Sequence, residues 1–447
     1  MPDPAPETTT ALPVIIVGAG PIGLAAAAHV LERDLTPLVL ESGEHIAASI
    51  RDWGHTRLFS PWQYNIDDAA RRLLDTTGLV APDPDALPTG QELIDDYLTP
   101  LAEALGDRIQ TGVRVVAVSR DGIDKTRSTH RAETPLLVRV RTADGTETDL
   151  AAQAVLDASG TWNQPNPLGR SGLPAPGEHT AYEQGRITAP LPDVLGADRN
   201  RFANRRVLVV GSGHSAANTL LDLAELATTA PDTQIHWAIR STDPSRVYGG
   251  EDQDELAARG ALGTRLRHLV EPGTITLHTS TMITGFTTTD TALSVTTQTP
   301  QGMQDLEVDA VVAATGFRPD LTMLQELRLD LDPAVEAPRQ LGPLIDAEFH
   351  SCGSVAPHGE RVLAHPEPGF YIVGMKSYGR APTFLMATGY EQVRSIAAAL
   401  AGDRQAADDV HLNLPETGVC TTDLPSSCDT TPALLTLSPS AITCCSN

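Results

Sequence analysis

Glycines recur at a characteristic spacing in this chain, and the first set is Gly18, Gly20 and Gly23. They follow the apolar run Val14–Val17 and open an alanine-rich run. Between a strand and a helix, this spacing permits a tight turn, close approach of backbone N–H groups to a pyrophosphate, and tight helix–strand packing. Glu41 ends the next apolar run, where an acid accepts hydrogen bonds from ribose hydroxyls. These residues predict a dinucleotide site; a purely structural glycine turn is the alternative.

The same pattern occurs a second time, after the apolar run that ends at Val210. This second turn comprises Gly211, Gly213, Ser215 and Ala216. Alanine is tolerated at the third glycine position. The next apolar run ends in Arg240 instead of an acid, and Arg246 follows. Because arginine pairs with a 2′-phosphate, the second site is predicted to prefer NADP over NAD, with a plain surface charge as the alternative.

The five cysteines are unevenly distributed. Cys352 lies between His350 and His358, and the end of the chain holds Cys420, Cys428, Cys444 and Cys445. A nearby histidine favours the thiolate, which is the form that attacks substrates and binds metals. Soft thiolates select soft ions such as Cu(I), zinc, trivalent arsenic or mercury. The alternatives are that Cys352 is a small buried apolar residue and that the other four are inert.

The composition excludes several classes of function. The 447-residue chain has a formal net charge of −25, and only Lys125 and Lys376 are lysines. Such an acidic surface repels phosphate backbones and anionic lipids, so neither nucleic acid nor a membrane is expected as a partner. The N-terminus lacks the basic region of a signal peptide, so a cytoplasmic protein is expected. Five cysteines are too few for a disulfide scaffold.

Buried strands and helices are needed to position the two turns. Strands are expected at 14–17, 37–40, 154–157, 206–210, 234–239, 309–313 and 370–373, and helices at about 21–33, 214–227 and 384–400. The Pro/Gly-rich stretch Asn163–Gly177 is a candidate crossing between domains. Beyond Gly402 the chain becomes rich in Thr, Ser and Pro, which predicts an extended tail.

The order of the motifs carries a family resemblance. The motifs are, in order, the first glycine turn, Ser159-Gly160, the second glycine turn, Thr315-Gly316 and Gly374. This order resembles the two-dinucleotide-domain flavoproteins, which include flavin-containing monooxygenases and thioredoxin-reductase-like enzymes. The resemblance implies an α/β fold with two Rossmann-like domains, the second inserted in the first. The implied parts are an FAD-binding domain at 1–165 and 318–402, an NADPH-binding domain at 166–317, and an extended cysteine-containing tail at 403–447.

The resemblance also assigns residues to the cofactors. It implies that FAD contacts Gly18, Gly20, Gly23, Glu41, Val115 and Gly374. It also implies that NADPH contacts Gly211, Gly213, Ser215, Ala216, Arg240 and Arg246. It adds four turn residues as cofactor contacts, namely Ser159, Gly160, Thr315 and Gly316. Residues 51–61 are similar to a segment that covers the flavin in monooxygenase-like members, with Trp53 and Arg57 as its contacts. Trp53 as a core aromatic is the alternative.

Departures from the family narrow the expected chemistry. The chain has no CxxC motif, and residues 42–70 hold no cysteine, so no disulfide is predicted beside the flavin to accept a hydride. Oxygen or a small molecule is then the expected acceptor, although the signature of flavin monooxygenases before the second turn is degenerate. Near Gly374, where many relatives carry an acid, stands Lys376. A cation there would stabilise the reduced anionic flavin; a solvated loop lysine is the alternative.

Two hypotheses follow. The vicinal pair Cys444-Cys445 resembles the tail of mercuric reductase, and the whole chain looks like flavoprotein monooxygenases of actinobacterial arsenic-resistance clusters. The first hypothesis is an FAD- and NADPH-dependent monooxygenase that uses O₂ on a trivalent arsenical or a thiol, with Cys352, His358 and Lys376 as catalytic residues and the tail cysteines capturing the metalloid. The second is a redox-responsive metal(loid)-binding flavoprotein, or a metal(loid) reductase. The resemblance also allows a homodimer.

Overall fold

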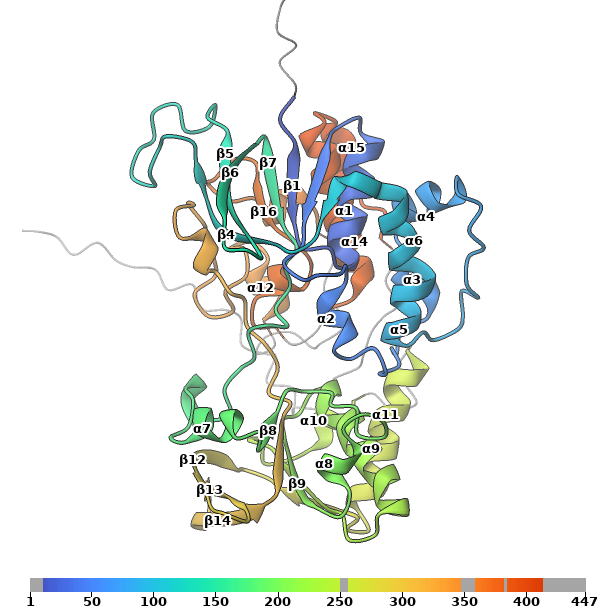
Figure 1. Ribbon diagram of the computed structural model, residues 1–447, viewed down its shortest axis with the longest axis vertical. Helices are drawn as coiled ribbons and strands as arrows, with labels where there is room; N and C mark the ends of the chain where they lie inside the picture. Colours follow the sequence, from blue (N-terminus) through green and yellow to red (C-terminus); the bar gives the residue numbers. More distant parts are fainter. Residues whose placement is uncertain (1–10, 250–255, 347–357, 382–383, 413–447) are drawn as a thin grey trace, which may run out of the picture.

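The apolar run Val14–Val17 is buried at every residue and forms β1, the central strand of a five-stranded sheet. The computed structural model describes residues 11–249, 256–346, 358–381 and 384–412 (Figure 1). The strand order of this first sheet is β16-β7-β1-β2-β3, and all its pairs are parallel. The other strands are β2 (Pro37–Leu40), β3 (Ile109–Gln110), β7 (Ala154–Asp157) and β16 (Phe370–Ile372).

The two faces of the first sheet bury different partners, because alternate residues of a strand point to opposite faces. Val14 and Ile16 join a core with helices α1 (Pro21–Glu32) and α14 (Met386–Leu400). Ile15 and Val17 join a second core with an antiparallel sheet of β4 (Val113–Arg120), β5 (Leu136–Thr142) and β6 (Glu147–Ala152).

Short helices complete the first domain. Its other helices are α2 (Ala48–Arg51), α3 (Trp62–Asn65), α4 (Asp68–Asp75), α5 (Gly90–Leu93), the π-helix Ile94–Leu98, α6 (Thr99–Leu105), α12 (Gly342–Ile345), α13 (Glu360–Leu363) and α15 (Arg404–Asp408). The 3₁₀ turns are Gly106–Arg108, Thr322–Leu324 and Gly374–Tyr378.

The second domain repeats the plan of the first. Its parallel sheet has the order β11-β10-β9-β15-β8, with β8 (Ile187–Thr188), β9 (Arg206–Val210), β10 (Gln234–Ala238), β11 (Ile275–His278) and β15 (Ala310–Ala313). One face packs on α9 (His214–Thr229) and α11 (Ala257–Val270), and the other on β12 (Met282–Thr288), β13 (Leu293–Thr299) and β14 (Gly302–Val308). The remaining helices are the 3₁₀ turn Arg170–Gly172, α7 (Glu178–Glu183), α8 (Arg199–Phe202) and α10 (Ser245–Tyr248).

The second sheet lies between β7 and β16 in the chain, so the predicted pair of Rossmann-like domains, one inserted in the other, is confirmed. The chain crosses between the two lobes twice, and the crossings are paired (Figure 1). Asn166 N donates to Gly316 O at 2.9 Å, and Arg318 N donates to Gln164 O at 2.9 Å. Trp162 packs on Phe317 beside them, with ring centroids 5.0 Å apart.

The structure differs from the sequence prediction after Gly402. Instead of an extended tail from residue 403, helix α15 begins one residue later, and the Asp403 side chain caps it by accepting from Ala406 N. Asp403 also pairs with Arg33 at 2.7 Å, which ties this segment to α1. Residues 403–412 therefore belong to the first domain. No helix within the described ranges combines the length and apolar character needed to span a bilayer.

Candidate functional site

The first glycine turn has the steric signature of a phosphate cradle. Gly18 has φ +101°, and a Cβ there would lie 2.8 Å from Ala158 O. A Cβ on Gly23 would lie 1.9 Å from Gly18 O, so strand and helix approach closely only because that residue is glycine. Gly20 differs, because a Cβ there would meet nothing within 4 Å. The open space is thus on the side of the turn from which a pyrophosphate would approach.

The helix that follows this turn presents uncapped N–H groups to the open side. Gly20 is the N-cap of α1, and no side chain caps the first turn. Such a helix end binds an anion through its backbone donors and dipole. Glu41 lies beside it, buried, and its carboxylate accepts from Ala19 N at 2.8 Å and Gly43 N at 2.7 Å. The residues present therefore fit the phosphate and ribose of a dinucleotide.

A buried ion pair joins two turns at the carboxyl edge of the first sheet. Lys376 Nζ lies 2.7 Å from Asp157 Oδ2, with side chains 2% and 0% exposed. The contact is an ion pair without hydrogen-bond geometry, because Oδ2 lacks a correctly aligned donor. Lys376 Nζ donates to Ser159 Oγ at 3.1 Å, and Ser159 Oγ donates to Asp157 Oδ1 at 2.6 Å. Lys376 is therefore not a solvated loop lysine.

A second buried network supports the Gly374 turn. The Gln392 side chain accepts from Gly374 N at 2.8 Å and donates to Ser377 Oγ at 2.9 Å. Its amide nitrogen lies 3.0 Å from His358 Nε2. Because Gly374 N fixes the orientation of the amide, Gln392 donates and His358 Nε2 accepts, which requires a neutral ring with its proton on Nδ1. His358 thus supports the turn through Gln392.

The second glycine turn has the same steric pattern as the first. Gly211 has φ +137°, and a Cβ there would lie 1.9 Å from Ala314 O, whereas a Cβ on Gly213 would meet nothing within 4 Å. Ala216 is fully buried at the third glycine position. Gly213 is the N-cap of α9, without a side-chain cap. Arg240 follows β10, is exposed, and forms no hydrogen bond or ion pair with the described part of the chain.

The other residues that were predicted to contact a cofactor lie at several different places in the two domains. Trp53 is half-buried against Gly90, where a Cβ would lie 2.9 Å from the indole ring. Arg57 is exposed, donates to Leu87 O and lies 3.6 Å from Glu92. Val115 is buried in the same core as Leu40 of β2, and Val113 N of the same strand donates to Glu41 O at 2.8 Å. The turn residues then fall into two pairs: Ser159 and Gly160 beside the first glycine turn, and Thr315 and Gly316 at the domain crossing.

Several predicted residues lie outside the described residues. These are Cys352, Cys420, Cys428, Cys444 and Cys445, and the side chain of Arg246. Within the described ranges, no group of three His, Cys, Asp or Glu side chains is placed to hold a metal ion. Their roles stay predictions.

Asp157 and Gln392 support the site but belong to none of the sequence motifs. One signal for Asp157 was available, because a charged residue ends the otherwise apolar run Ala154–Leu156. A buried carboxylate at a strand end requires a partner of opposite charge or several donors. Gln392 gave no such signal, because it lies in a helical pattern that tolerates glutamine on any exposed face.

A family model described as pyridine nucleotide-disulphide oxidoreductase matches residues 15–339. A search of the curated proteins finds no match.

Solved structures of similar fold cover most of the chain. One is the bacillithiol disulfide reductase of Bacillus cereus, with 20% identity, a TM-score of 0.66, and coverage of 88% of this chain and 99% of that one. Another is the ornithine N-hydroxylase of Kutzneria sp. 744, with 17% identity, TM-score 0.60, and 89% and 100% coverage. The thioredoxin reductase of T. acidophilum has 15% identity, TM-score 0.55, and 88% and 98% coverage. At these identities the likeness establishes the fold.

Proposed function

The chain belongs to the pyridine nucleotide-disulphide oxidoreductase family, and on this premise we propose that it is an FAD- and NADPH-dependent monooxygenase. FAD binds at the first glycine turn and NADPH at the second. When bound, the flavin supplies two reactions: it accepts a hydride from NADPH, and in its reduced form it reacts with O₂. Structures of similar fold include a reduced, NADP⁺-bound ornithine N-hydroxylase, which supports both cofactors and the oxygen chemistry.

The chain's own residues bind and orient the cofactors. The open N-termini of α1 and α9 hold pyrophosphates, and Glu41 accepts from a ribose. The pair of Lys376 and Asp157 fastens the Ser159 turn to the Gly374 turn. Because that pair carries almost no net charge, we propose Lys376 as a positioning residue, in place of a free cation beside the flavin.

The single observation that carries the monooxygenase proposal is the placement of cysteine. The chain has no CxxC and no cysteine between residues 42 and 70, and none of the residues that the structure describes is a cysteine. A dithiol route from flavin to a disulfide substrate therefore has no redox pair in the described domains. O₂ is then the electron acceptor, with a small nucleophile taking one oxygen atom.

We propose a trivalent arsenical or a thiol as that nucleophile, on the basis of the soft tail thiols Cys420, Cys428, Cys444 and Cys445. For an arsenical, NADPH, a proton, O₂ and the arsenic(III) species give NADP⁺, water and the arsenic(V) oxo species. Arsenic and NADPH each lose two electrons, and these four electrons reduce the two atoms of O₂. Cys352 would receive the substrate from the tail.

The test measures NADPH, O₂ and product together on the FAD-loaded protein, with and without methylarsenite. We expect NADPH to bleach the flavin without O₂, and substrate-dependent product to form only with O₂, in equal amounts to NADPH consumed. If NADPH leaves the flavin oxidised, the enzyme is not an NADPH oxidoreductase. If all NADPH ends as hydrogen peroxide with each arsenical and thiol tried, the monooxygenase assignment is wrong.

The vicinal pair Cys444-Cys445 favours a second candidate, a metal(loid) reductase or binding protein. A reductase would form product without O₂ and would lose it on truncation after residue 419. A binding protein would retain ion affinity without NADPH. A truncated chain with unchanged ion affinity would exclude the tail from every one of these roles.

Arg240 is expected to set the preference for NADPH over NADH. Replacing Arg240 by alanine removes a charge-assisted contact to the 2′-phosphate, worth about 1.5–3 kcal/mol, which corresponds to an about 10- to 100-fold higher KM for NADPH. The KM for NADH should stay the same, because NADH lacks that phosphate. Steady-state kinetics with both cofactors measure the ratio.

The matched control is Arg205→Ala, which removes the same charge from an exposed residue at the amino end of β9, the opposite edge of the sheet. It should leave the KM for both cofactors near wild type. Equal losses in the two variants would mean that Arg240 acts only through overall charge.

A further inference from the structure

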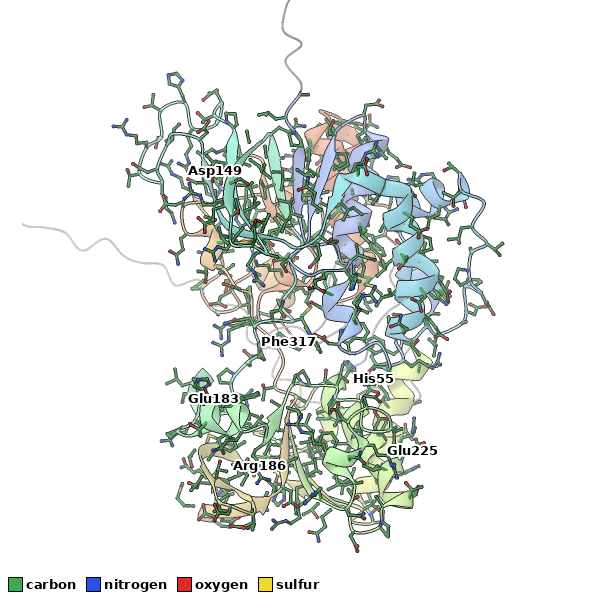
Figure 2. The ribbon with its side chains drawn as sticks, in the orientation of Figure 1. His55, Asp149, Glu183, Arg186, Glu225 and Phe317 are labelled. Carbon is green, nitrogen blue, oxygen red and sulfur yellow. The ribbon has the colours of Figure 1, made fainter. Side chains whose placement is uncertain are left out.

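Phe59, in residues 51–61 of the first domain, lies against the start of helix α9 of the second. The ring of Phe59 contacts the ring of His214, with centroids 5.0 Å apart and planes tilted by 42°. His55, four residues earlier in the chain, lies at the junction of the two lobes (Figure 2). Burial raises the pKa of Asp222 on α9 to about 6, and the charge of His55 opposes that rise. Asp52 at the start of the segment accepts from Trp162 Nε1 at 2.8 Å.

The spacing along α9 allows Phe59 to contact His214 while His55 acts on the charge of Asp222. His214 and Asp222 are separated by two turns, so they share one face of the helix about 12 Å apart. Four residues from His55 to Phe59 span at most about 14 Å when extended. The chain from Phe59 to His55 is thus long enough to reach from the start of α9, where Phe59 contacts His214, toward Asp222.

That end of α9 is where a dinucleotide has to cross between domains. Its 2′-phosphate end belongs at Arg240 and its pyrophosphate at the Gly211–Gly213 turn, both in the second domain. Its nicotinamide must reach the flavin at the carboxyl edge of the first sheet. Gly213 and His214 are exposed at this junction, and Phe59 is the first-domain ring that contacts His214.

We propose that Phe59 is a positioning residue for NADPH, whose ring, braced on His214, forms the first-domain wall of the nicotinamide dinucleotide site. This inference rests on the proposed function, because it assumes that the second turn binds NADPH. The aromatic contact orders the entry to that turn. Phe59 is thus assigned to NADPH, although it lies in the segment predicted to cover the flavin.

The test is calorimetric titration of the FAD-loaded protein with NADP⁺, which needs no turnover. An aromatic pair contributes about 0.5–1.5 kcal/mol, so Phe59→Ala and His214→Ala should each weaken NADP⁺ binding about 3- to 10-fold. The double variant should bind no more weakly than the worse single variant, because both lose the same contact. Phe59→Tyr, which keeps the ring, should restore wild-type affinity, and FAD content should be unchanged throughout.

Gln63→Ala is the matched control, because Gln63 is exposed and bonded to Asp85, within the first domain. Three outcomes would overturn the inference: unchanged affinity in Phe59→Ala, losses in the two single variants that add in the double variant, or loss of FAD, which would place the ring on the flavin. A wild-type protein that fails to bind NADP⁺ would overturn the proposed function itself. Wild type and variants that bind equally would overturn only the role of Phe59.

Discussion

Replacing Lys376 by methionine is expected to lower the free energy of unfolding by about 3–5 kcal/mol. The substitution leaves Asp157 fully buried with one carboxylate oxygen lacking any partner, although Oδ1 still accepts from Ser159. An uncompensated buried charge is among the most destabilising changes available to a folded protein. Urea unfolding followed by circular dichroism measures the loss. FAD affinity should fall in parallel, because the Ser159 and Gly374 turns are no longer fastened together.

The double variant Asp157→Asn with Lys376→Met separates pairing from packing. It removes both charges, so it should be more stable than either single variant. Lys125→Met is the matched control: it is the other lysine of the chain, its side chain is exposed, and it donates to Gln325 O. That change should stay within about 0.5 kcal/mol of wild type. Losses that simply add in the double variant would show that Lys376 and Asp157 act independently.

The sequence predicted seven of the ten strands in the two parallel sheets, because each of the seven is a short apolar run. The other three, β3, β8 and β11, were not predicted. Val14–Val17 and Arg206–Val210 are buried on both faces, and such strands read as continuous apolar runs. The two antiparallel sheets were not predicted. Strands such as Met282–Thr288 and Gly302–Val308 have only one covered face, and their threonines and acids resemble loop composition.

The site was predictable only where its residues are neighbours in the chain. Both glycine turns act through local geometry, so spacing alone identified them. Lys376 and Ser159 are 217 positions apart, and their contact depends on β7 and β16 pairing in the first sheet. The contact of Phe59 with His214 depends on how two domains dock. The end of the first domain was misplaced for the same reason, because Asp403 is held by Arg33, 370 positions earlier.

Replacing Gly20 by alanine is expected to weaken FAD binding strongly while the fold is kept. Gly20 has φ −83° and ψ −175°, which any residue adopts, and a Cβ there would touch nothing within 4 Å. That methyl group would occupy the space into which a pyrophosphate fits, and would remove contacts to backbone donors worth about 1.5–3 kcal/mol each. We expect the Kd for FAD to rise about 100-fold, as measured by flavin fluorescence, with an unchanged circular dichroism spectrum.

Alanine variants of two further glycines, Gly23 and Gly213, test whether the effect of Gly20→Ala is specific to FAD. In Gly23→Ala the new Cβ would lie 1.9 Å from Gly18 O, so the turn itself must open, and the loss of stability should accompany the loss of FAD. Gly213 lies at the second turn and resembles Gly20, because its φ is −96° and a Cβ there would touch nothing within 4 Å. The variant Gly213→Ala should therefore also keep the fold. This variant should retain FAD and lose NADP⁺, the reverse of Gly20→Ala. If Gly20→Ala weakened NADP⁺ alone, or Gly213→Ala weakened FAD alone, the two cofactors would have been assigned to the wrong turns.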